Sequence, residues 1–136
     1  MNTAIIVAAG SGSRFGAEQP KQFVEILGKP LIIHTLEKFQ ACPAVDEIVL
    51  VLPADAIGGF QISNFRSDIG KLKQVVAGGA TRAESVRNGL DAVAGATTVV
   101  AVHDGARPLV STEEIAATID KATEVGAACL VGAVTD

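Results

Sequence analysis

The feature that most constrains this chain is an alternation of short aliphatic runs with segments of helical periodicity. The aliphatic runs lie at residues 3–9, 46–52, 73–77, 98–102 and 127–134. Runs of this length and composition are typical of strands that are buried on both faces of a parallel sheet. Because strands that alternate with helices form right-handed βαβ units, we predict an α/β fold with an open, mostly parallel sheet of about five strands and helices on both faces.

The segments between these runs carry the local signals of helix ends. The predicted helices cover residues 30–40, 81–94 and 111–126. Pro30 is favourable in a first turn, and Gly126 suits a helix end. Thr81 and Ser111 are each followed three residues later by a glutamate, which is the capping-box pattern. Helical spacing predicts that each helix turns one side toward the sheet. The residues on those sides are Leu31, Thr35, Leu36 and Phe39, then Ala83, Val86, Leu90 and Val93, and finally Ile115, Ile119 and Ala122.

Length and composition limit what kind of protein this is. The chain has 136 residues, of which 49% are hydrophobic, so it suits a single α/β domain spanning residues 1–136. A net charge of −4 does not suggest a nucleic-acid-binding protein, which needs a basic surface. Cys42 and Cys129 lack a paired spacing, which indicates reduced thiols and a cytoplasmic location. No apolar run is long enough to cross a bilayer, so we expect no membrane partner, and we interpret the first run as a strand, not a signal peptide.

Three polar clusters follow predicted strands directly, at residues 10–21, 78–82 and 103–107. In open parallel sheets, ligands bind beyond the carboxyl ends of the strands, and those ends lie at one edge of the sheet. We therefore expect the three clusters to form one ligand site. Their coincidence is stronger evidence than any one of them alone.

The first cluster combines small residues with two cations. Gly10 and Gly12 allow the backbone to approach a ligand, and successive N–H groups can bind an anion. Arg14 and Lys21 add positive charge, which favours triphosphate binding. The segment is not a dinucleotide fingerprint, because Phe15 occupies the third glycine position, and it is not a P-loop. The alternative is a flexible connection without a ligand.

The other two clusters offer groups for a metal, an anion and a nucleoside. Asp104 is placed to hold Mg²⁺, which prefers one or two carboxylates together with substrate phosphates, although aspartate before glycine is also common in turns. Arg107 is suited to an anionic substrate, or it is a solvated surface residue. Gly79, Arg82 and Ser85 are candidates to receive a base or ribose, or they form only a turn and a helix cap.

Histidine catalysis is not indicated by this sequence. His34 falls within a predicted helix and is expected to be structural. His103 is expected to pack against or orient the turn that follows it. No Ser/His/Asp or Cys/His set can be assembled from the remaining residues.

Five motifs together resemble the 2-C-methyl-D-erythritol 4-phosphate cytidylyltransferase family. They are AAGSGSRFG at residues 8–16, PKQF at 20–23, GKPLIIHTL at 28–36, GGATRAESVRNGL at 78–90 and VHDGARPLV at 102–110. The resemblance implies a Rossmann-like nucleotidyltransferase domain. It also implies Mg²⁺-dependent transfer of CMP from CTP to 2-C-methyl-D-erythritol 4-phosphate, with release of pyrophosphate, in isoprenoid precursor biosynthesis.

The same resemblance implies roles for individual residues. Arg14 and Lys21 match the pair that stabilises the transition state. Asp104 matches the metal-binding aspartate, and Arg107 matches an arginine near the acceptor phosphate. The remaining matches are the CTP-contacting positions Ala8, Ala9, Gly10 and Gly12 and the cytidine-contacting positions Gly79 and Ser85.

Two departures from the family pattern matter. Ala80 stands where many relatives carry an acidic residue, so one ribose or base contact is in doubt. Family members also continue well beyond residue 136, with a β-arm used in dimerisation and a later lysine that positions the acceptor. We therefore expect the full-length enzyme to be a homodimer and this segment alone to be poorly active or inactive. The alternatives are a ribitol-5-phosphate cytidylyltransferase and a nucleotide-binding module without catalysis.

Overall fold

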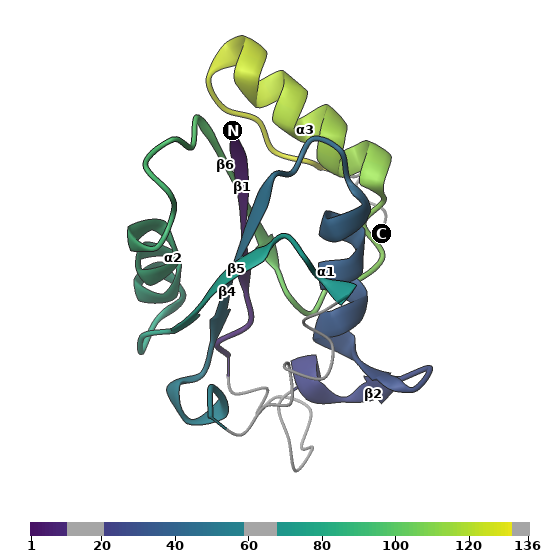
Figure 1. The fold of residues 1–136 in the computed structure, drawn as a ribbon, viewed down its shortest axis with the longest axis vertical. Helices are drawn as coiled ribbons and strands as arrows, with labels where there is room; N and C mark the ends of the chain where they lie inside the picture. The colour runs from purple at the N-terminus through teal and green to yellow at the C-terminus, as the bar shows by residue number, and fades with distance from the viewer. Residues whose placement is uncertain (11–20, 59–67, 132–136) are drawn as a thin grey trace, which may run out of the picture.

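A four-stranded parallel sheet forms the centre of the molecule, and a small hairpin lies beside it (Figure 1). The computed structural model describes residues 1–10, 21–58 and 68–131. The strands of the large sheet are β1 (Asn2–Val7), β4 (Glu47–Leu52), β5 (Leu72–Ala77) and β6 (Val99–Asp104). The hairpin pairs β2 (Glu25–Ile26) with β3 (Lys29–Pro30). The helices are α1 (Leu31–Ala41), α2 (Arg82–Asp91) and α3 (Thr112–Val125), with short 3-10 helices η2 (Lys21–Phe23) and η3 (Ala54–Ala56).

Strand pairing confirms the predicted open parallel sheet. The strand order is β5-β4-β1-β6, and each neighbouring pair is parallel. Val7 of β1 pairs with Val51 on one side and with Asp104 on the other. The fourth predicted strand, residues 98–102, therefore extends further than expected, because its pairing with β1 continues through Asp104 instead of ending at Val102.

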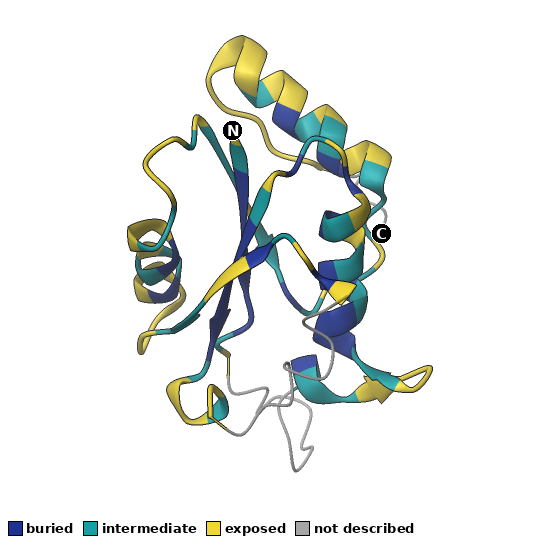
Figure 2. Cartoon of the chain, viewed as in Figure 1, coloured by how far each residue is buried: buried dark blue, intermediate teal, exposed yellow. Residues whose placement is uncertain are grey.

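Helices cover both faces of the sheet, as predicted (Figure 1). Ala4 and Ile6 of β1 belong to the core cluster that includes α1 and α3. Ile5 and Val7 belong to a second cluster, in which the sheet packs against α2. Figure 2 shows the buried central strands between these layers. The alternation along β1 explains its composition, since a strand covered on both faces has no side that tolerates polar residues.

The predicted helix signals are largely confirmed. The Ser111 hydroxyl accepts from the Glu114 backbone, and the Glu114 carboxylate accepts from the Ser111 backbone, so the capping box of α3 is complete. Gly126 ends α3 with a φ of 99°, a left-handed conformation that glycine adopts without strain. At the start of α2, the Thr81 hydroxyl caps Glu84 as expected.

The predicted inner face of α2 is wrong at two positions. Leu90 is 46% exposed and Ala83 is exposed, whereas Ser85 and Gly89 are buried. A Cβ atom added at Gly89 would lie 2.6 Å from Ile5 Cγ2. The helix thus approaches the sheet along a side with small residues, which the hydrophobic pattern alone could not identify.

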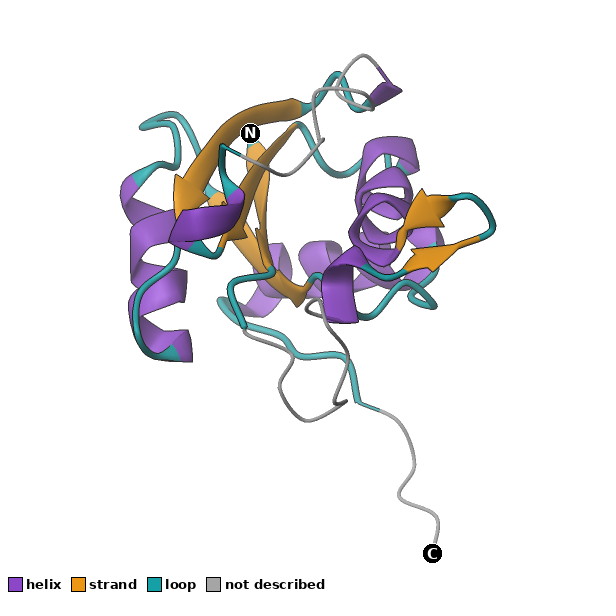
Figure 3. Cartoon of the chain, turned by 90° about the horizontal axis from the view of Figure 1, so that it is seen from below, coloured by secondary structure: helices purple, strands orange, loops and turns teal. Residues whose placement is uncertain are grey.

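The fifth predicted strand is also corrected over the residues that the structure describes. Residues 127–131 form no strand, and Figure 3 draws them as loop. Leu130 and Val131 are 52% and 81% exposed. An aliphatic run becomes a strand only when its backbone finds a pairing partner, and this stretch has none in the described sheet. The rest of the predicted strand, residues 132–134, lies outside the described residues.

The described helices include none with both the length and the apolar character that a bilayer crossing demands.

Candidate active site

The carboxyl ends of the parallel strands form a continuous rim. Three backbone hydrogen bonds of 2.8 Å run past the strand ends, from Ala8 N to Val51 O, from Gly78 N to Leu52 O and from Gly105 N to Val7 O. Residues 8–10, 78–79 and 104–105 therefore leave the sheet at the same edge. This is the edge at which open α/β sheets bind ligands.

Close packing at two glycines brings the second and third predicted clusters against the end of the β1 segment, just before the first cluster. A Cβ atom added at Gly78 would lie 2.3 Å from Ala9 Cβ, and one added at Gly105 would lie 2.9 Å from Ala8 Cβ. Real Cβ atoms do not approach one another so closely, so only glycine fits at these positions. The segment that follows β1 thus lies between the turns that follow β5 and β6. The second and third clusters are thus brought to the residues that lead into the first cluster, and the formation of one ligand site by all three stays a prediction.

A glutamine without a predicted role connects Gly10 of the first cluster to η2. Gln22 is buried, and its Nε2 donates to the carbonyl oxygens of Ala8 at 2.7 Å and Gly10 at 2.8 Å. Lys21, the predicted cationic residue, is the first residue of η2 and is half-buried. Lys21 is therefore held near the rim by its neighbour. In the sequence, the local signal for the hydrogen bonds of Gln22 was its polar side chain next to Lys21 in the PKQF motif.

Two of the predicted site residues, Gly12 and Arg14, lie outside the described residues. Their proposed parts in phosphate binding and transition-state stabilisation stay predictions.

Asp104 ends β6 with its carboxylate at the rim. Its Oδ1 accepts from the Ala106 backbone at 3.1 Å, and its Oδ2 lies 3.5 Å from Arg107 Nε. The Asp104 side chain is 41% exposed and that of Arg107 is 78% exposed, so both remain accessible to a ligand. The predicted acid and the predicted anion-binding arginine are thus neighbours.

The donor set around Asp104 fits a magnesium ion that is shared with phosphates. Across residues 1–10, 21–58 and 68–131, no three histidine, cysteine or acidic side chains are grouped so that they could hold a metal. A site with one accessible carboxylate needs its other ligands from water or substrate. Mg²⁺ is commonly bound in this way, through one or two carboxylates together with substrate phosphates.

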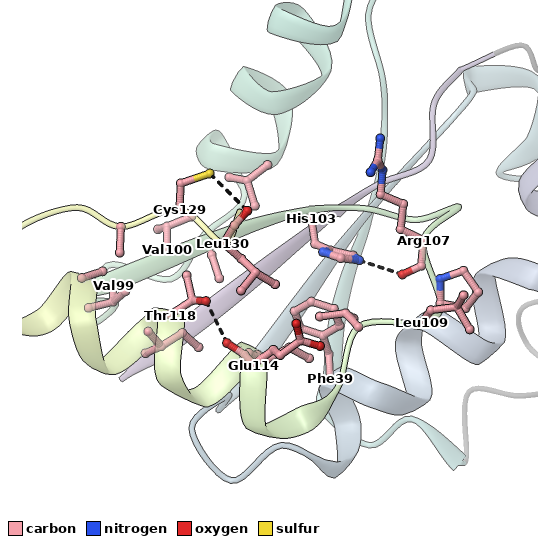
Figure 4. A pocket seen from close by; sticks show the side chains of 18 of the residues that line it. Phe39, Val99, Val100, His103, Arg107, Leu109, Glu114, Thr118, Cys129 and Leu130 are labelled. Carbon is pink, nitrogen blue, oxygen red and sulfur yellow. Dashed lines mark hydrogen bonds between the residues drawn. The ribbon is translucent and has the colours of Figure 1, made fainter. Parts of the chain in front are cut away.

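The turn that carries Asp104 is supported from α1. The Thr35 hydroxyl donates to Gly105 O at 2.7 Å. His103 Nε2 lies 2.9 Å from Arg107 O, and its ring centroid is 5.0 Å from that of Phe39 (Figure 4). His103 therefore orients the turn, as predicted. His34, also expected to be structural, hydrogen-bonds through its ring to Ile26 O.

The second cluster is organised around a buried hydroxyl. Ser85 is 2% exposed, and its Oγ accepts a hydrogen bond of 3.1 Å from Gly79 N. The Glu84 carboxylate accepts from Ala80 N at 2.7 Å, so the reciprocal bond of the capping box falls on Ala80 instead of Thr81. The Ser85 oxygen thus shapes the glycine turn. Arg82 is exposed at the start of α2.

A large groove lies next to this rim but is not the candidate site. It has a volume of about 690 Å³ and is formed mainly by apolar residues of β6 and α3 (Figure 4). It includes His103 and Arg107, but neither Asp104 nor any residue of 8–10, 21–22 or 78–85. The chemical groups gather on the rim, so the rim is the candidate site.

Comparison with known proteins identifies the family of this chain. The family profile of 2-C-methyl-D-erythritol 4-phosphate cytidylyltransferase matches residues 2–136. A protein of that name from Porphyromonas gingivalis is 51% identical over 91% of this chain and 54% of its own length. One from Clostridium acetobutylicum is 44% identical over 95% and 57%. The chain thus spans about half the length of the curated relatives it matches.

Solved structures show the same relationship. The 4-diphosphocytidyl-2C-methyl-D-erythritol synthase of Anaerococcus prevotii is 32% identical, with a TM-score of 0.75 over 89% of this chain and 50% of that one. A second crystal structure of a synthase of that name is 31% identical, with a TM-score of 0.71 over 91% and 55%. The profile match extends over nearly every residue, so this chain belongs to the 2-C-methyl-D-erythritol 4-phosphate cytidylyltransferase family.

Proposed function

We propose that this chain forms the CTP-binding part of an enzyme that transfers CMP from CTP to 2-C-methyl-D-erythritol 4-phosphate and releases pyrophosphate. The observation that carries the proposal is the meeting on one rim of the segment that leaves β1 with the turns after β5 and β6, where Ala8 and Ala9 lie against Gly105 and Gly78. Family membership supports the same activity. The domain assignment, a single nucleotidyltransferase domain over residues 1–136, belongs to this proposal.

The chemistry requires charge neutralisation more than proton transfer. A phosphate oxygen of the acceptor attacks the α-phosphorus of CTP in line. A P–O bond forms to that oxygen, and the bond between the α-phosphorus and the bridging oxygen breaks, so pyrophosphate leaves with the electron pair. The acceptor is already an anion and needs no strong base. Lys21 and Arg14 are proposed to neutralise the charge that builds up on the phosphates, as cationic groups do in phosphoryl transfer.

Asp104 is proposed to hold Mg²⁺ at the rim. The ion, when bound, neutralises phosphate charge and orients the phosphate chain. Arg107 lies beside Asp104 and is proposed to bind the acceptor phosphate, for which its 78% exposed side chain is free to reach outward. An arginine suits this task because its planar guanidinium can donate two parallel hydrogen bonds to one phosphate.

Backbone groups of the rim are proposed to receive the nucleotide. Ala8, Ala9, Gly10 and Gly12 have small side chains, which allow the phosphates and base to approach the main chain. Gly79 and Ser85 are proposed to contact the cytidine. The Ser85 oxygen accepts from Gly79 N, and its hydroxyl also carries one proton that can be donated.

Two assignments concern the intact protein. We propose that it acts in the cytoplasm as a homodimer. Analytical ultracentrifugation of the intact protein tests the second of these, and a monomer at micromolar concentration would contradict it.

Binding and product analysis test the proposed reaction. We expect calorimetric titration to detect CTP binding in the presence of Mg²⁺ and weaker binding of ATP. Incubation of the intact protein with CTP and either 2-C-methyl-D-erythritol 4-phosphate or ribitol 5-phosphate should yield a cytidylylated product with the first acceptor. Exclusive use of ribitol 5-phosphate, or CTP binding without any transfer, would contradict the proposal.

A further inference from the structure

A buried amide side chain ties the end of β1 to the 3-10 helix that bears Lys21. Gln22 is 5% exposed, and its Nε2 donates to Ala8 O at 2.7 Å and to Gly10 O at 2.8 Å. We propose that Gln22 is a positioning residue of the CTP site, which holds the phosphate-binding backbone and Lys21 in one fixed arrangement. This inference rests on the proposed function, because it assigns a role within the same site.

The hydrogen-bond chemistry of the amide suits this task. A primary amide nitrogen carries two N–H donors, and Gln22 directs both to carbonyl groups of the backbone that leaves β1. Burying a polar group is unfavourable unless it is hydrogen-bonded, and an apolar side chain of similar size could fill the same space. What the amide adds at this position is therefore the link to the two carbonyl oxygens.

The position of this link beneath the rim makes Gln22 a supporting residue. Gln22 and Ala8 are buried, whereas Gly10 is exposed. The nucleotide is expected to meet the exposed backbone and the Lys21 side chain, while Gln22 fixes their relative positions from below. Gln22 acts through other groups and is not a catalytic residue.

The link extends to both neighbouring elements. On one side, η2 packs against α1, and Leu31 N donates to Val24 O at 2.9 Å just after η2. On the other side, Ala8 N donates to Val51 O and Ala8 packs against Gly105, next to Asp104. Gln22 thereby fixes the position of Lys21 relative to the turn that carries Asp104, the proposed metal ligand.

Steady-state kinetics of the intact protein test this role. Gln22→Met keeps the approximate shape of the side chain and removes both donors. The matched control is Gln40→Met, because Gln40 Oε1 accepts a hydrogen bond of 2.9 Å from Lys71 N near the other end of α1. We expect Gln22→Met to lower kcat/KM for CTP by roughly 10- to 100-fold, with a higher KM, on the scale of two lost hydrogen bonds. Gln40→Met should change kcat/KM by less than about threefold, on the scale of one lost bond remote from the site.

The results separate positioning from folding and from the proposed function. An unchanged KM for CTP in Gln22→Met, with activity reduced only by the unfolded fraction seen in circular dichroism, overturns the inference. If that variant does not fold, Gln22→Asn replaces it, because its shorter amide can reach at most one carbonyl. A raised KM for CTP in Gln22→Asn then supports the inference, and an unchanged KM overturns it. A wild-type protein that makes no cytidylylated product instead contradicts the proposed function, whereas an active wild type with an unaffected Gln22 variant contradicts this inference alone.

Discussion

The Thr35 hydroxyl donates a 2.7 Å hydrogen bond to the carbonyl oxygen of Gly105, so a side chain in the middle of α1 supports the turn next to Asp104. Thr35 is fully buried and Gly105 is buried. A buried carbonyl that loses its partner pays the full cost of desolvation. The position of the proposed metal ligand is therefore coupled to the packing of α1 against the sheet.

Replacing this hydroxyl tests the coupling. Thr35→Val keeps the shape of the side chain and leaves Gly105 O without its donor, so we expect the free energy of unfolding to fall by about 1–3 kcal/mol. Urea denaturation measures this change. The control is Thr118→Val, which removes a hydrogen bond to the carbonyl oxygen of Glu114 within the same helix. In this control the free energy of unfolding should fall by less than about 0.5 kcal/mol. Equal losses in the two variants would contradict the proposed support.

Gly78→Ala should disturb the CTP site. The added Cβ would lie 2.3 Å from Ala9 Cβ and 2.7 Å from Ser85 Oγ, so the backbone at the rim must move. We expect overpacking to cost about 1–3 kcal/mol of stability and the dissociation constant for CTP to rise by roughly 10-fold or more. Calorimetric titration measures the affinity. The control is Gly70→Ala, where an added Cβ has no neighbour within 4 Å; matching affinities in both variants would contradict convergence on one ligand site.

Asp104→Asn should weaken the response to magnesium. The substitution removes the negative charge that the proposed Mg²⁺ site requires but keeps an oxygen that can accept from Ala106 N. We expect the rate of CMP transfer to fall by roughly 10²- to 10³-fold, and half-saturation to need more Mg²⁺, by analogy with the removal of one preorganised electrostatic group. Loss of the exposed pair with Arg107 contributes little to stability.

A magnesium titration of the transfer rate provides the measurement for Asp104→Asn. Asp120→Asn is its control, because Asp120 is an exposed carboxylate of α3 that lies away from the rim. An unchanged half-saturating Mg²⁺ concentration in Asp104→Asn would contradict the metal assignment.

Gly89→Ala should destabilise the fold although alanine favours helices. The gain in helix propensity is about 1 kcal/mol. Against it, the added Cβ would lie 2.6 Å from Cγ2 of Ile5 and 3.1 Å from Cγ2 of Val51, which are both fully buried residues. The cost of overpacking, about 1–3 kcal/mol, should exceed the gain in helix propensity and lower the melting temperature. Gly95→Ala, which meets nothing within 4 Å, is the control, and a higher melting temperature in Gly89→Ala would contradict the close approach of α2 to the sheet.

Local features of the fold were predictable because neighbouring residues create them. Ser111 and Glu114 form their capping box within one helical turn, and Gly126 ends α3 through its own backbone conformation. The polar clusters beyond the strands were also visible, since each follows an aliphatic run directly. The shared rim followed from one general property of parallel sheets, namely that their strands all point the same way.

The errors and omissions involve contacts between distant parts of the chain. The apolar spacing of α2 predicted Leu90 as an inward residue, but the close approach at Gly89 depends on Ile5 and Val51. Residues 127–131 have the composition of a strand and no pairing partner in the described sheet. The positions of Gln22 and Thr35 in the sequence do not reveal that they bind the backbone of Gly10 and Gly105.

The amino-acid sequence by itself determined the alternation of the four central strands with the helices, the caps of the helices, the kinds of chemical groups at the site and the family. Tertiary structure alone decided the strand order, the face that α2 presents and the hydrogen bonds from Gln22 and Thr35 that organise the rim. The physical reason is the distance along the chain between the residues that interact. Caps and periodicity depend on residues a few positions apart, whereas strand order and buried hydrogen bonds depend on which distant segments share the same core.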